Sequence, residues 1–390
     1  QSYIFELAAI ITKNLDAKRK AESKSRFGFF YTTFIYQIHI FHHIQGNILM
    51  WLAALAILIG LAILVWSADV FIDGATALAK KFSVPSFLIG VLILGIGTSA
   101  PEMVVSVLAA IEGSPELALG NAYGSNIINI ALVLGATVLI SPIIIRRGIV
   151  KRDLPLLLLI TVIAAWQLRD GTLSQADGIV LLILLVAVLG LQIIMSIREG
   201  YHEHEDDMVV VNADSAHLNN LENLNNSESL EKLEPSVTRG LVSLIIGMLM
   251  LVASSRAIVW GAVELATLWG LSELIIGLTI VAVGTSLPEL VSSLSAARKG
   301  EHDMALGNII GSNIFNTLAV VGLATVIAPI AADPVILSRD VMAMGLLTIL
   351  LVTLCVFAFK TKRQFGRTSG AMLVLFFMGY TAWLIQSVSM

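Results

Sequence analysis

Two long stretches of the chain are copies of one another. Residues 97–145 read GTSAPEMVVSVLAAIEGSPELALGNAYGSNIINIALVLGATVLISPIII, and residues 284–332 read GTSLPELVSSLSAARKGEHDMALGNIIGSNIFNTLAVVGLATVIAPIAA. They align without a gap at an offset of 187 residues, and about half of the aligned positions are identical. A repeat of this length indicates that the chain consists of two similar halves.

The composition is that of a membrane protein. Of the 390 residues, 57% are hydrophobic and only 13% are charged, whereas soluble domains carry about 25% charged residues. So little charge excludes a soluble enzyme. The 24 basic and 28 acidic residues give a net charge of −4, which excludes a nucleic-acid binder. A single cysteine, Cys355, excludes an intrachain disulfide and a cysteine-rich metal site.

The repeat lies within ten apolar blocks, and about 20 apolar residues suffice for a helix to cross a bilayer. Each half holds five blocks, and an odd number of crossings brings the second half into the membrane from the opposite side. We therefore predict an all-α polytopic membrane protein of ten transmembrane helices, arranged as two inverted-topology five-helix repeats. The predicted spans are 50–78, 85–111, 116–140, 150–168, 176–197, 237–265, 272–297, 303–328, 339–359 and 369–389.

The first repeat is predicted over 50–198 and the second over 237–390. The linker between them, 199–236, contains ten acidic residues against Lys232 alone, which is typical of a solvated, disordered segment. Its HEHEDD stretch at 202–207 could hold a metal loosely. A charged tail with incidental histidines is the favoured interpretation.

Residues 1–49 do not fit this plan. They carry six basic residues and an aromatic stretch at 27–46 that is too polar for a clear span, and the first methionine is Met50. We expect the functional protein to start at Met50 and 1–49 to be a non-native or poorly ordered extension. The alternative is that 27–46 crosses or dips into the membrane.

Basic residues predict the orientation in the membrane. Fifteen Lys and Arg residues lie in the loops that follow odd-numbered spans, whereas the opposite loops beyond residue 50 hold Arg169 and Arg339 alone. Positively charged loops stay on the cytoplasmic side. We therefore expect a multi-pass protein of the plasma (inner) membrane, with the linker cytoplasmic and the C-terminus outside.

Glu102 and Glu289 occupy equivalent positions inside apolar spans. A charge at the bilayer centre costs about 2.5–3.5 kcal/mol even on the lenient insertion scale, so it faces protein or water and marks a functional site. Arg256, the one basic residue away from the end of a span, cannot neutralise both carboxylates. A bound cation explains the pair better than an ion pair does.

Each glutamate follows a proline, Pro101 or Pro288. Proline removes a backbone donor and frees the carbonyl four residues earlier, here that of Gly97 or Gly284. Lipid offers these carbonyls no partner, and a cation would. The alternative is an ordinary proline kink whose carbonyl is satisfied by a neighbouring hydroxyl. Hydroxyl oxygens beside each carboxylate complete the motif, from Thr98 and Ser99 and from Thr285 and Ser286.

The span after each glutamate carries a polar stripe at four-residue spacing, which places its members on one helical face. This face is expected to line the ion path, although such a stripe can also serve only in helix packing. Asn126 and Asn313 point elsewhere and are expected to form interhelical hydrogen bonds. The stripe comprises Asn121, Ser125 and Asn129 in the first repeat and Asn308, Ser312 and Asn316 in the second.

All of these groups offer oxygen, and no histidine or cysteine lies in the motifs. Oxygen ligands suit hard cations such as Ca²⁺ and Na⁺ and disfavour zinc or copper. Two carboxylates balance one Ca²⁺ or two Na⁺. Either load therefore neutralises the site. The empty site stays charged, and carrying that charge through the membrane interior is unfavourable.

GTSxPE followed by GNxxGSNIxN, present in both halves, resembles the alpha repeats of sodium/calcium exchangers of the calcium:cation antiporter superfamily, in particular prokaryotic members. The resemblance covers residues 50–390 apart from the linker. It implies that the first and sixth spans form a mobile pair that alternates access to the ions. Familiar members often carry Asp where Asn316 stands, which bears on stoichiometry. The implied metal ligands are Thr98, Ser99, Glu102, Ser125, Asn129, Thr285, Ser286, Glu289, Ser312 and Asn316.

The function predicted is therefore secondary active antiport of Ca²⁺ against Na⁺ through one alternating site. The alternatives are coupling to H⁺ or K⁺ and, from another class, a passive cation channel. We expect neither enzymatic activity nor a resident cofactor. We expect the protein to be a monomer in the lipid bilayer. Asp69 and Arg256 stand at equivalent repeat positions and are expected either to pair with each other or to face the aqueous ends.

Overall fold

The computed structural model describes residues 26–195, 237–270, 282–332, 334 and 336–389. Within these ranges, eight helices are long and apolar enough to cross a membrane. All eight coincide with predicted spans, which confirms an all-α polytopic membrane protein. They are Ile48–Phe82, Ser86–Ile111, Pro115–Ile140, Gln175–Met195, Val237–Leu268, His302–Ile327, Ile336–Lys360 and Arg367–Gln386.

The two remaining predicted spans are described differently. The span 150–168 coincides with a helix made of η3 (Ile149–Asp153) and α7 (Leu154–Gln167). The span 272–297 begins among residues outside the description, and the part that is described contains α11 (Ala282–Thr285) and α12 (Leu287–Arg298). The linker 199–236, with its HEHEDD stretch, also lies outside the described residues.

The first helix, α2, runs from Arg26 to Phe82. It therefore begins upstream of Met50, in the segment that we assigned to an extension. No proline interrupts 26–82, and nothing in the local sequence stops a helix that has started there. Residues 1–25 lie outside the description, so the prediction that 1–49 is dispensable stays a prediction.

Where the structure describes both copies, the helices around Asn129 and Asn316 have the same geometry. The helix that carries Asn129 changes from α to π geometry at that residue, and its copy does so at Asn316. π-Helical turns occur often at functional sites. The first half contains α3 (Ser86–Ile89), η1 (Gly90–Leu94), α4 (Gly95–Ile111), α5 (Pro115–Ile128), η2 (Asn129–Leu134), α6 (Gly135–Ile140), η3, α7 and the short η4 (Leu168–Asp170). The second contains α9 (Val237–Leu268), α11, α12, α13 (His302–Phe315), η6 (Asn316–Val320), α14 (Val321–Ile327), η7 (Ile336–Val341), α15 (Met342–Lys360) and α16 (Arg367–Ser389).

The centre of the bundle is the span made of α13, η6 and α14, most of whose residues are buried. It is crossed closely by α3 and η1, where a Cβ on Gly307 would lie 2.5 Å from the carbonyl of Phe87 and 3.1 Å from Cα of Gly90. Two short backbone pairings tie the ends of the halves together. Strand β1 (Thr172–Leu173) pairs antiparallel with β2 (Ile330–Ala331), and Ile143 bridges to Phe365.

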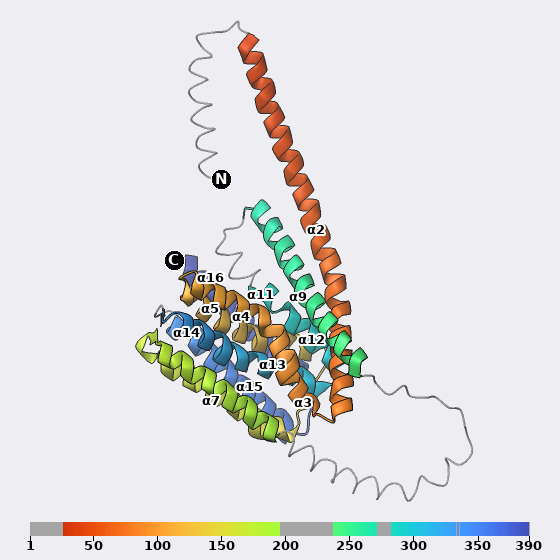
Figure 1. The fold of residues 1–390 in the computed structure, drawn as a ribbon, viewed down its shortest axis with the longest axis vertical. Helices are drawn as coiled ribbons and strands as arrows, with labels where there is room; N and C mark the ends of the chain where they lie inside the picture. Colours follow the sequence, from red (N-terminus) through yellow and green to blue (C-terminus); the bar gives the residue numbers. More distant parts are fainter. Residues whose placement is uncertain (1–25, 196–236, 271–281, 333, 335, 390) are drawn as a thin grey trace, which may run out of the picture.

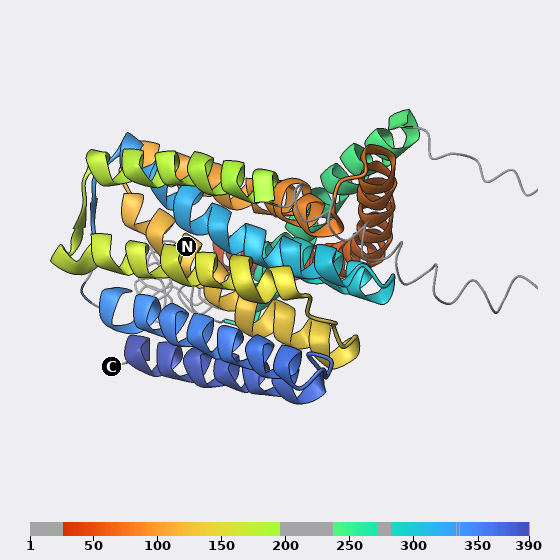
Figure 2. The same cartoon turned by 90° about the horizontal axis from the view of Figure 1, so that it is seen from below.

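Helices α2 and α9 form a pair beside the bundle (Figures 1 and 2). Glycines bring their backbones together: a Cβ on Gly74 would lie 2.5 Å from the nitrogen of Leu244, and one on Gly247 would lie 2.5 Å from the nitrogen of Phe71. The repeat copies of these contacts are also present, at Gly261 and Gly60. Small residues at such contacts let membrane helices approach closely.

Gly247→Ala is expected to destabilise the protein by about 1–3 kcal/mol, because the new methyl group meets backbone rather than a flexible side chain. Gly345→Ala is the matched control. Nothing lies within 4 Å of a Cβ at this helical glycine, so the change is expected to stabilise by about 0.5–1 kcal/mol. Thermal unfolding in detergent measures both, and equal transitions would contradict the close α2–α9 contact.

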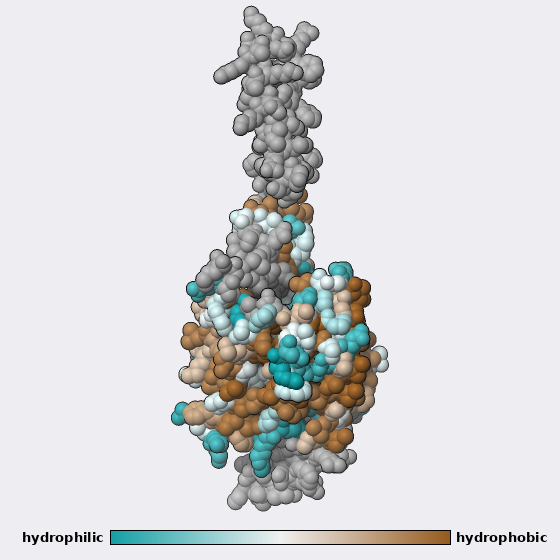
Figure 3. Space-filling model, turned by 90° about the vertical axis from the view of Figure 1, so that its left-hand side faces the viewer, coloured by the Kyte–Doolittle hydropathy of each residue, from teal (hydrophilic) through white to brown (hydrophobic). Residues whose placement is uncertain are grey.

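The outer surface is apolar. Large exposed side chains include Trp51, Leu58, Trp166 and Val186, and Figure 3 shows brown, hydrophobic residues over much of one face. Soluble monomers rarely expose contiguous apolar patches beyond a few hundred Å². The surface fits contact with lipid.

Candidate functional site

Glu102 and Glu289 lie in the interior of the protein, on α4 and α12. Their exposed fractions are 2% and 1%, and among the described residues none of their four carboxylate oxygens has a hydrogen-bond partner. The two carboxylates also repel one another electrostatically. Removing a charge from water costs several kcal/mol unless a partner compensates it. This arrangement therefore favours a cation between them.

Among the described residues, neutral side-chain oxygens of both halves are also buried without partners. Within the described part of the chain, the hydroxyls of Ser99 and Ser286 and the side-chain oxygens of Asn129 and Asn316 are buried without a hydrogen-bond partner. Buried polar groups are almost always paired. A cluster of unpaired acceptors next to two carboxylates has the chemistry of a hard-cation site.

The structure brings residues of the two halves together at this place. The hydroxyl of Thr98 lies 3.3 Å from Ser312 Oγ and donates to the carbonyl of Leu94 at 3.0 Å. It also lies beside the carboxylate of Glu289. Of the other predicted ligands, Ser125 is buried in α5 and Thr285 is half-buried in α11, which packs against α5.

One expectation about the proline kinks is corrected. The carbonyl of Gly284, freed by Pro288, accepts a hydrogen bond from Ser255 Oγ of α9 at 2.9 Å. The kink in the second half is therefore satisfied by a hydroxyl, which we had taken as the weaker alternative. The equivalent of Ser255 in the first half is Ala68, which has no hydroxyl to offer to Gly97.

Helix α9 covers both kinks. A Cβ on Gly97 would lie 2.9 Å from the sulfur of Met248, and one on Gly284 would clash with Val259. Side chains of α9 thus contact the site, whereas its contacts with α2 include close approaches of backbone to backbone at Gly74 and Gly247.

Asn121 and Asn308 hold the glutamate helices, a role that the polar stripe did not predict. The amide nitrogen of Asn121 donates to the carbonyl of Glu102 at 3.5 Å and to Ser106 Oγ at 3.1 Å. That of Asn308 donates to the carbonyl of Glu289 at 3.4 Å and to Ser293 Oγ at 2.8 Å. The signal in the sequence is that Ser106 and Ser293 are themselves equivalent repeat positions.

Asn126 and Asn313 behave differently from one another. Asn126 donates to Thr317 Oγ1 at 2.8 Å, across to the helix of the other half, as predicted. Asn313 donates to the carbonyl of Ile309 in its own helix at 2.7 Å, so the prediction of an interhelical bond is wrong there.

Asn308→Ala is expected to lower the apparent affinity for the transported cation about tenfold, because α12 loses the contacts that fix Glu289 and two buried serines lose a donor, a cost of about 1–3 kcal/mol. Asn313→Ala removes a similarly buried side-chain amide whose hydrogen bond stays within one helix, and this variant serves as the control. Cation-dependent thermal shifts in detergent measure both, and an equal loss of affinity in the two variants would contradict this role.

Asp69 and Arg256 do not pair with each other. Asp69 contacts Ser295 and Lys299 of the second half, and both Asp69 and Arg256 are exposed. Among the described residues, no group of three His, Cys, Asp or Glu side chains could hold a metal. The pair of glutamates with neutral oxygens is therefore the candidate site in this part of the chain.

Comparison with known proteins identifies relatives of this chain. The family described as "Sodium/calcium exchanger protein" matches residues 52–194 and 239–386. CaxA of Alkalimonas amylolytica is 40% identical over 87% of this chain and 100% of its own length. The sodium/calcium exchanger MaX1 of Methanosarcina acetivorans is 30% identical over 84% of this chain and 96% of its own.

A solved structure of the sodium-calcium exchanger NCX_Mj, soaked with Na⁺ and Sr²⁺, superposes with a TM-score of 0.68 at 32% identity. The match covers 85% of this chain and 98% of that one. With the fold and the buried carboxylates, these likenesses define the class as a membrane cation antiporter. The chain belongs to the sodium/calcium exchanger family.

Proposed function

We propose that this protein is a secondary active antiporter that exchanges Ca²⁺ for Na⁺ at one site in the middle of the membrane. The observation that carries the proposal is the pair of buried carboxylates, Glu102 and Glu289, whose oxygens have no partner among the described residues. MaX1 and NCX_Mj are named as sodium/calcium exchangers. The transported ions are substrates, and the protein needs no resident cofactor.

The proposed ligands provide a site charge of −2. One Ca²⁺ or two Na⁺ neutralise that charge, so either load can be carried through a low-dielectric barrier more easily than the charged site alone. Serine, threonine and asparagine oxygens complete the coordination that hard cations require. The ligand set is Thr98, Ser99, Glu102, Ser125, Asn129, Thr285, Ser286, Glu289, Ser312 and Asn316.

The architecture proposed is ten spans in two inverted five-helix repeats. Its support is the recurrence of contacts at the repeat offset, such as those of Gly74 and Gly261 between the antiparallel helices α2 and α9. The distribution of basic residues supports a cytoplasmic linker and an outer C-terminus in the plasma (inner) membrane. We propose that the protein acts as a monomer.

Alternating access is proposed to involve the α2–α9 pair moving relative to the bundle. Backbone contacts through glycine hold the two helices together, whereas side chains such as Met248 and Val259 lie against the site. Side-chain contacts can rearrange with less strain than backbone contacts can. The pair could therefore move as one body past Gly97 and Gly284.

The test is uptake of radioactive calcium into proteoliposomes loaded with sodium. Uptake is expected to follow the outward sodium gradient and to stop when the gradient is collapsed with a sodium ionophore. Uptake that instead follows an imposed pH or potassium gradient would replace sodium by H⁺ or K⁺. Uptake that is driven by calcium alone, with no dependence on a counter-ion, would indicate a passive channel and contradict exchange.

A further inference from the structure

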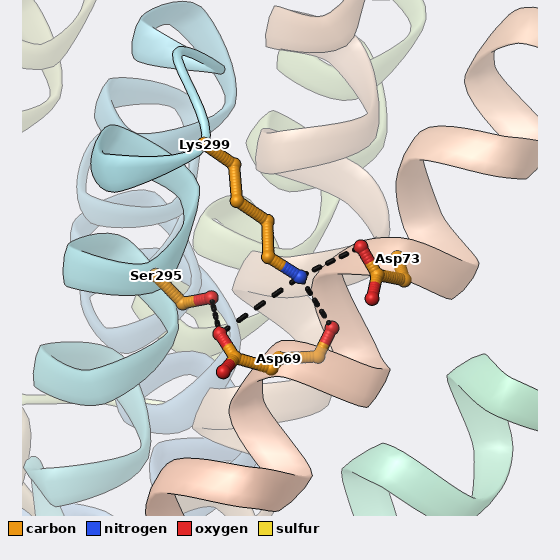
Figure 4. Close-up of polar contacts among 4 residues, drawn as sticks. All are labelled: Asp69, Asp73, Ser295 and Lys299. Carbon is orange, nitrogen blue, oxygen red and sulfur yellow. Dashed lines mark hydrogen bonds and ion pairs between the residues drawn. The ribbon is translucent and has the colours of Figure 1, made fainter.

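Polar contacts tie α12 to α2 at some distance along the chain from the glutamates. Lys299 Nζ lies 2.6 Å from Asp73 Oδ1 and 2.9 Å from the carbonyl oxygen of Asp69. One turn earlier on α12, Ser295 Oγ donates to Asp69 Oδ1 at 2.5 Å. Figure 4 shows the side chains of Ser295 and Lys299 reaching α2. We call these four residues the Lys299 cluster.

The repeat offset relates this cluster to a second pair of charges of inverted sign. Asp69 on α2 corresponds to Arg256 on α9, and Lys299 corresponds to Glu112. Lys299 and Glu112 each follow directly on the helix that carries a glutamate of the site, α12 or α4. We call Arg256 and Glu112 the Glu112 pair. At each equivalent place, therefore, a charge on one helix of the α2–α9 pair corresponds to an opposite charge directly after a glutamate helix.

The two sets differ in this structure. The Lys299 cluster is formed, with its lysine 30% exposed. Arg256 and Glu112 are both exposed, and within the described residues neither takes part in an ion pair or a side-chain hydrogen bond. Arg256 instead lies within electrostatic reach of Glu102. One of two equivalent contacts is thus made and the other is not.

We propose that the Lys299 cluster and the Glu112 pair form alternately and set the side of the membrane from which the ion site is reached. This rests on the proposed exchange function. In an inverted repeat, equivalent contacts lie toward opposite membrane faces. A movement of the α2–α9 pair that separates Lys299 from Asp73 on one face would bring Arg256 toward Glu112 on the other.

The two sets are unequal in strength. Asp73 corresponds to Trp260, and Ser295 corresponds to Leu108, so the Glu112 pair lacks the second acid and the hydroxyl of the Lys299 cluster. The state with the Lys299 cluster formed is therefore favoured. We call the membrane face nearer Lys299 the Lys299 face and the opposite one the Glu112 face. Without a gradient, the ion site is expected to be open mainly to the Glu112 face.

A partly exposed ion pair contributes little to global stability, usually under about 1 kcal/mol. An energy of this size is enough to change the balance between two access states. A conformer ratio changes about two- to fivefold for such an energy, and the apparent affinity at each face changes with the fraction of molecules open to it.

The test neutralises one member of each set and measures the apparent calcium affinity at both faces, in inside-out and right-side-out membrane vesicles. Lys299→Gln is expected to raise the affinity at the Lys299 face relative to the Glu112 face about two- to fivefold. Glu112→Gln is expected to change the same ratio in the opposite direction. The affinity ratio of the double variant is expected to lie between those of the two single variants.

Lys299→Arg keeps the charge and is expected to keep the wild-type ratio, and size-exclusion chromatography checks that each variant is folded. A merely structural role would change both faces alike, so unchanged ratios, or changes of the same sign in Lys299→Gln and Glu112→Gln, would overturn the proposal. The ratio can be measured with whichever counter-ion drives exchange. Failure of sodium coupling is therefore distinct from failure of this proposal.

Discussion

Replacing Glu102 or Glu289 with glutamine is expected to abolish sodium-driven calcium uptake, with a loss of at least about a hundredfold, since a charge-assisted ligand contributes about 1.5–3 kcal/mol and the site charge is halved. One remaining carboxylate cannot balance Ca²⁺. Both side chains are buried, so water cannot substitute for the lost charge. Uptake of radioactive calcium into sodium-loaded proteoliposomes measures the loss.

The same two variants are expected to fold at least as well as the wild type when sodium and calcium are removed, because each loses a buried charge that has no protein partner. Calcium should raise the unfolding temperature of the wild type but not of the variants. Glu116→Gln, at an exposed position on α5, is the matched control and should behave as the wild type. Full transport by Glu102→Gln or Glu289→Gln would contradict the proposed site.

Asn316→Asp is expected to make calcium exchange sensitive to membrane potential. Asn316 is buried with an unpaired side-chain oxygen and is one of the proposed ligands, so an aspartate there brings the site charge to −3. One calcium ion or two sodium ions would each leave a charge of −1 on this site. A third sodium ion would neutralise it, so exchange of three sodium ions for one calcium ion is favoured and each cycle moves net charge. Calcium uptake at imposed potassium diffusion potentials measures this change.

The wild type is expected to be insensitive to those potentials, since its −2 site carries the same charge with either load. Asn316→Ser, which keeps an oxygen without adding charge, should also be insensitive. Strong dependence on potential in the wild type would refute the charge balance. An insensitive Asn316→Asp would place residue 316 outside the transported charge.

The sequence alone predicted what depends on local chemistry and on the repeat. Lipid makes any buried carboxylate costly, so Glu102 and Glu289 stand out in an apolar chain, and their equivalence in the repeat marks them as a pair. The spans were predicted for the same reason. The π turns at Asn129 and Asn316 leave no such signal, because their residues are compatible with an ordinary helix.

Contacts between distant segments could not be read from local pattern. Ser255 meets the carbonyl of Gly284 only because α9 lies over α11, and no spacing in the sequence specifies that approach. The same is true of Lys299 and Asp73, which are 226 residues apart. The start of α2 at Arg26 also depends on more than hydropathy, since a helix continues through moderately polar residues when nothing breaks it.

The most direct test of the central claim, that one set of oxygens holds either ion in turn, is equilibrium binding of radioactive calcium to the purified protein during titration with sodium at constant ionic strength. The account predicts complete displacement, with a Hill coefficient of about two because two sodium ions replace one calcium at a site of charge −2. Calcium that stays bound at saturating sodium would contradict it.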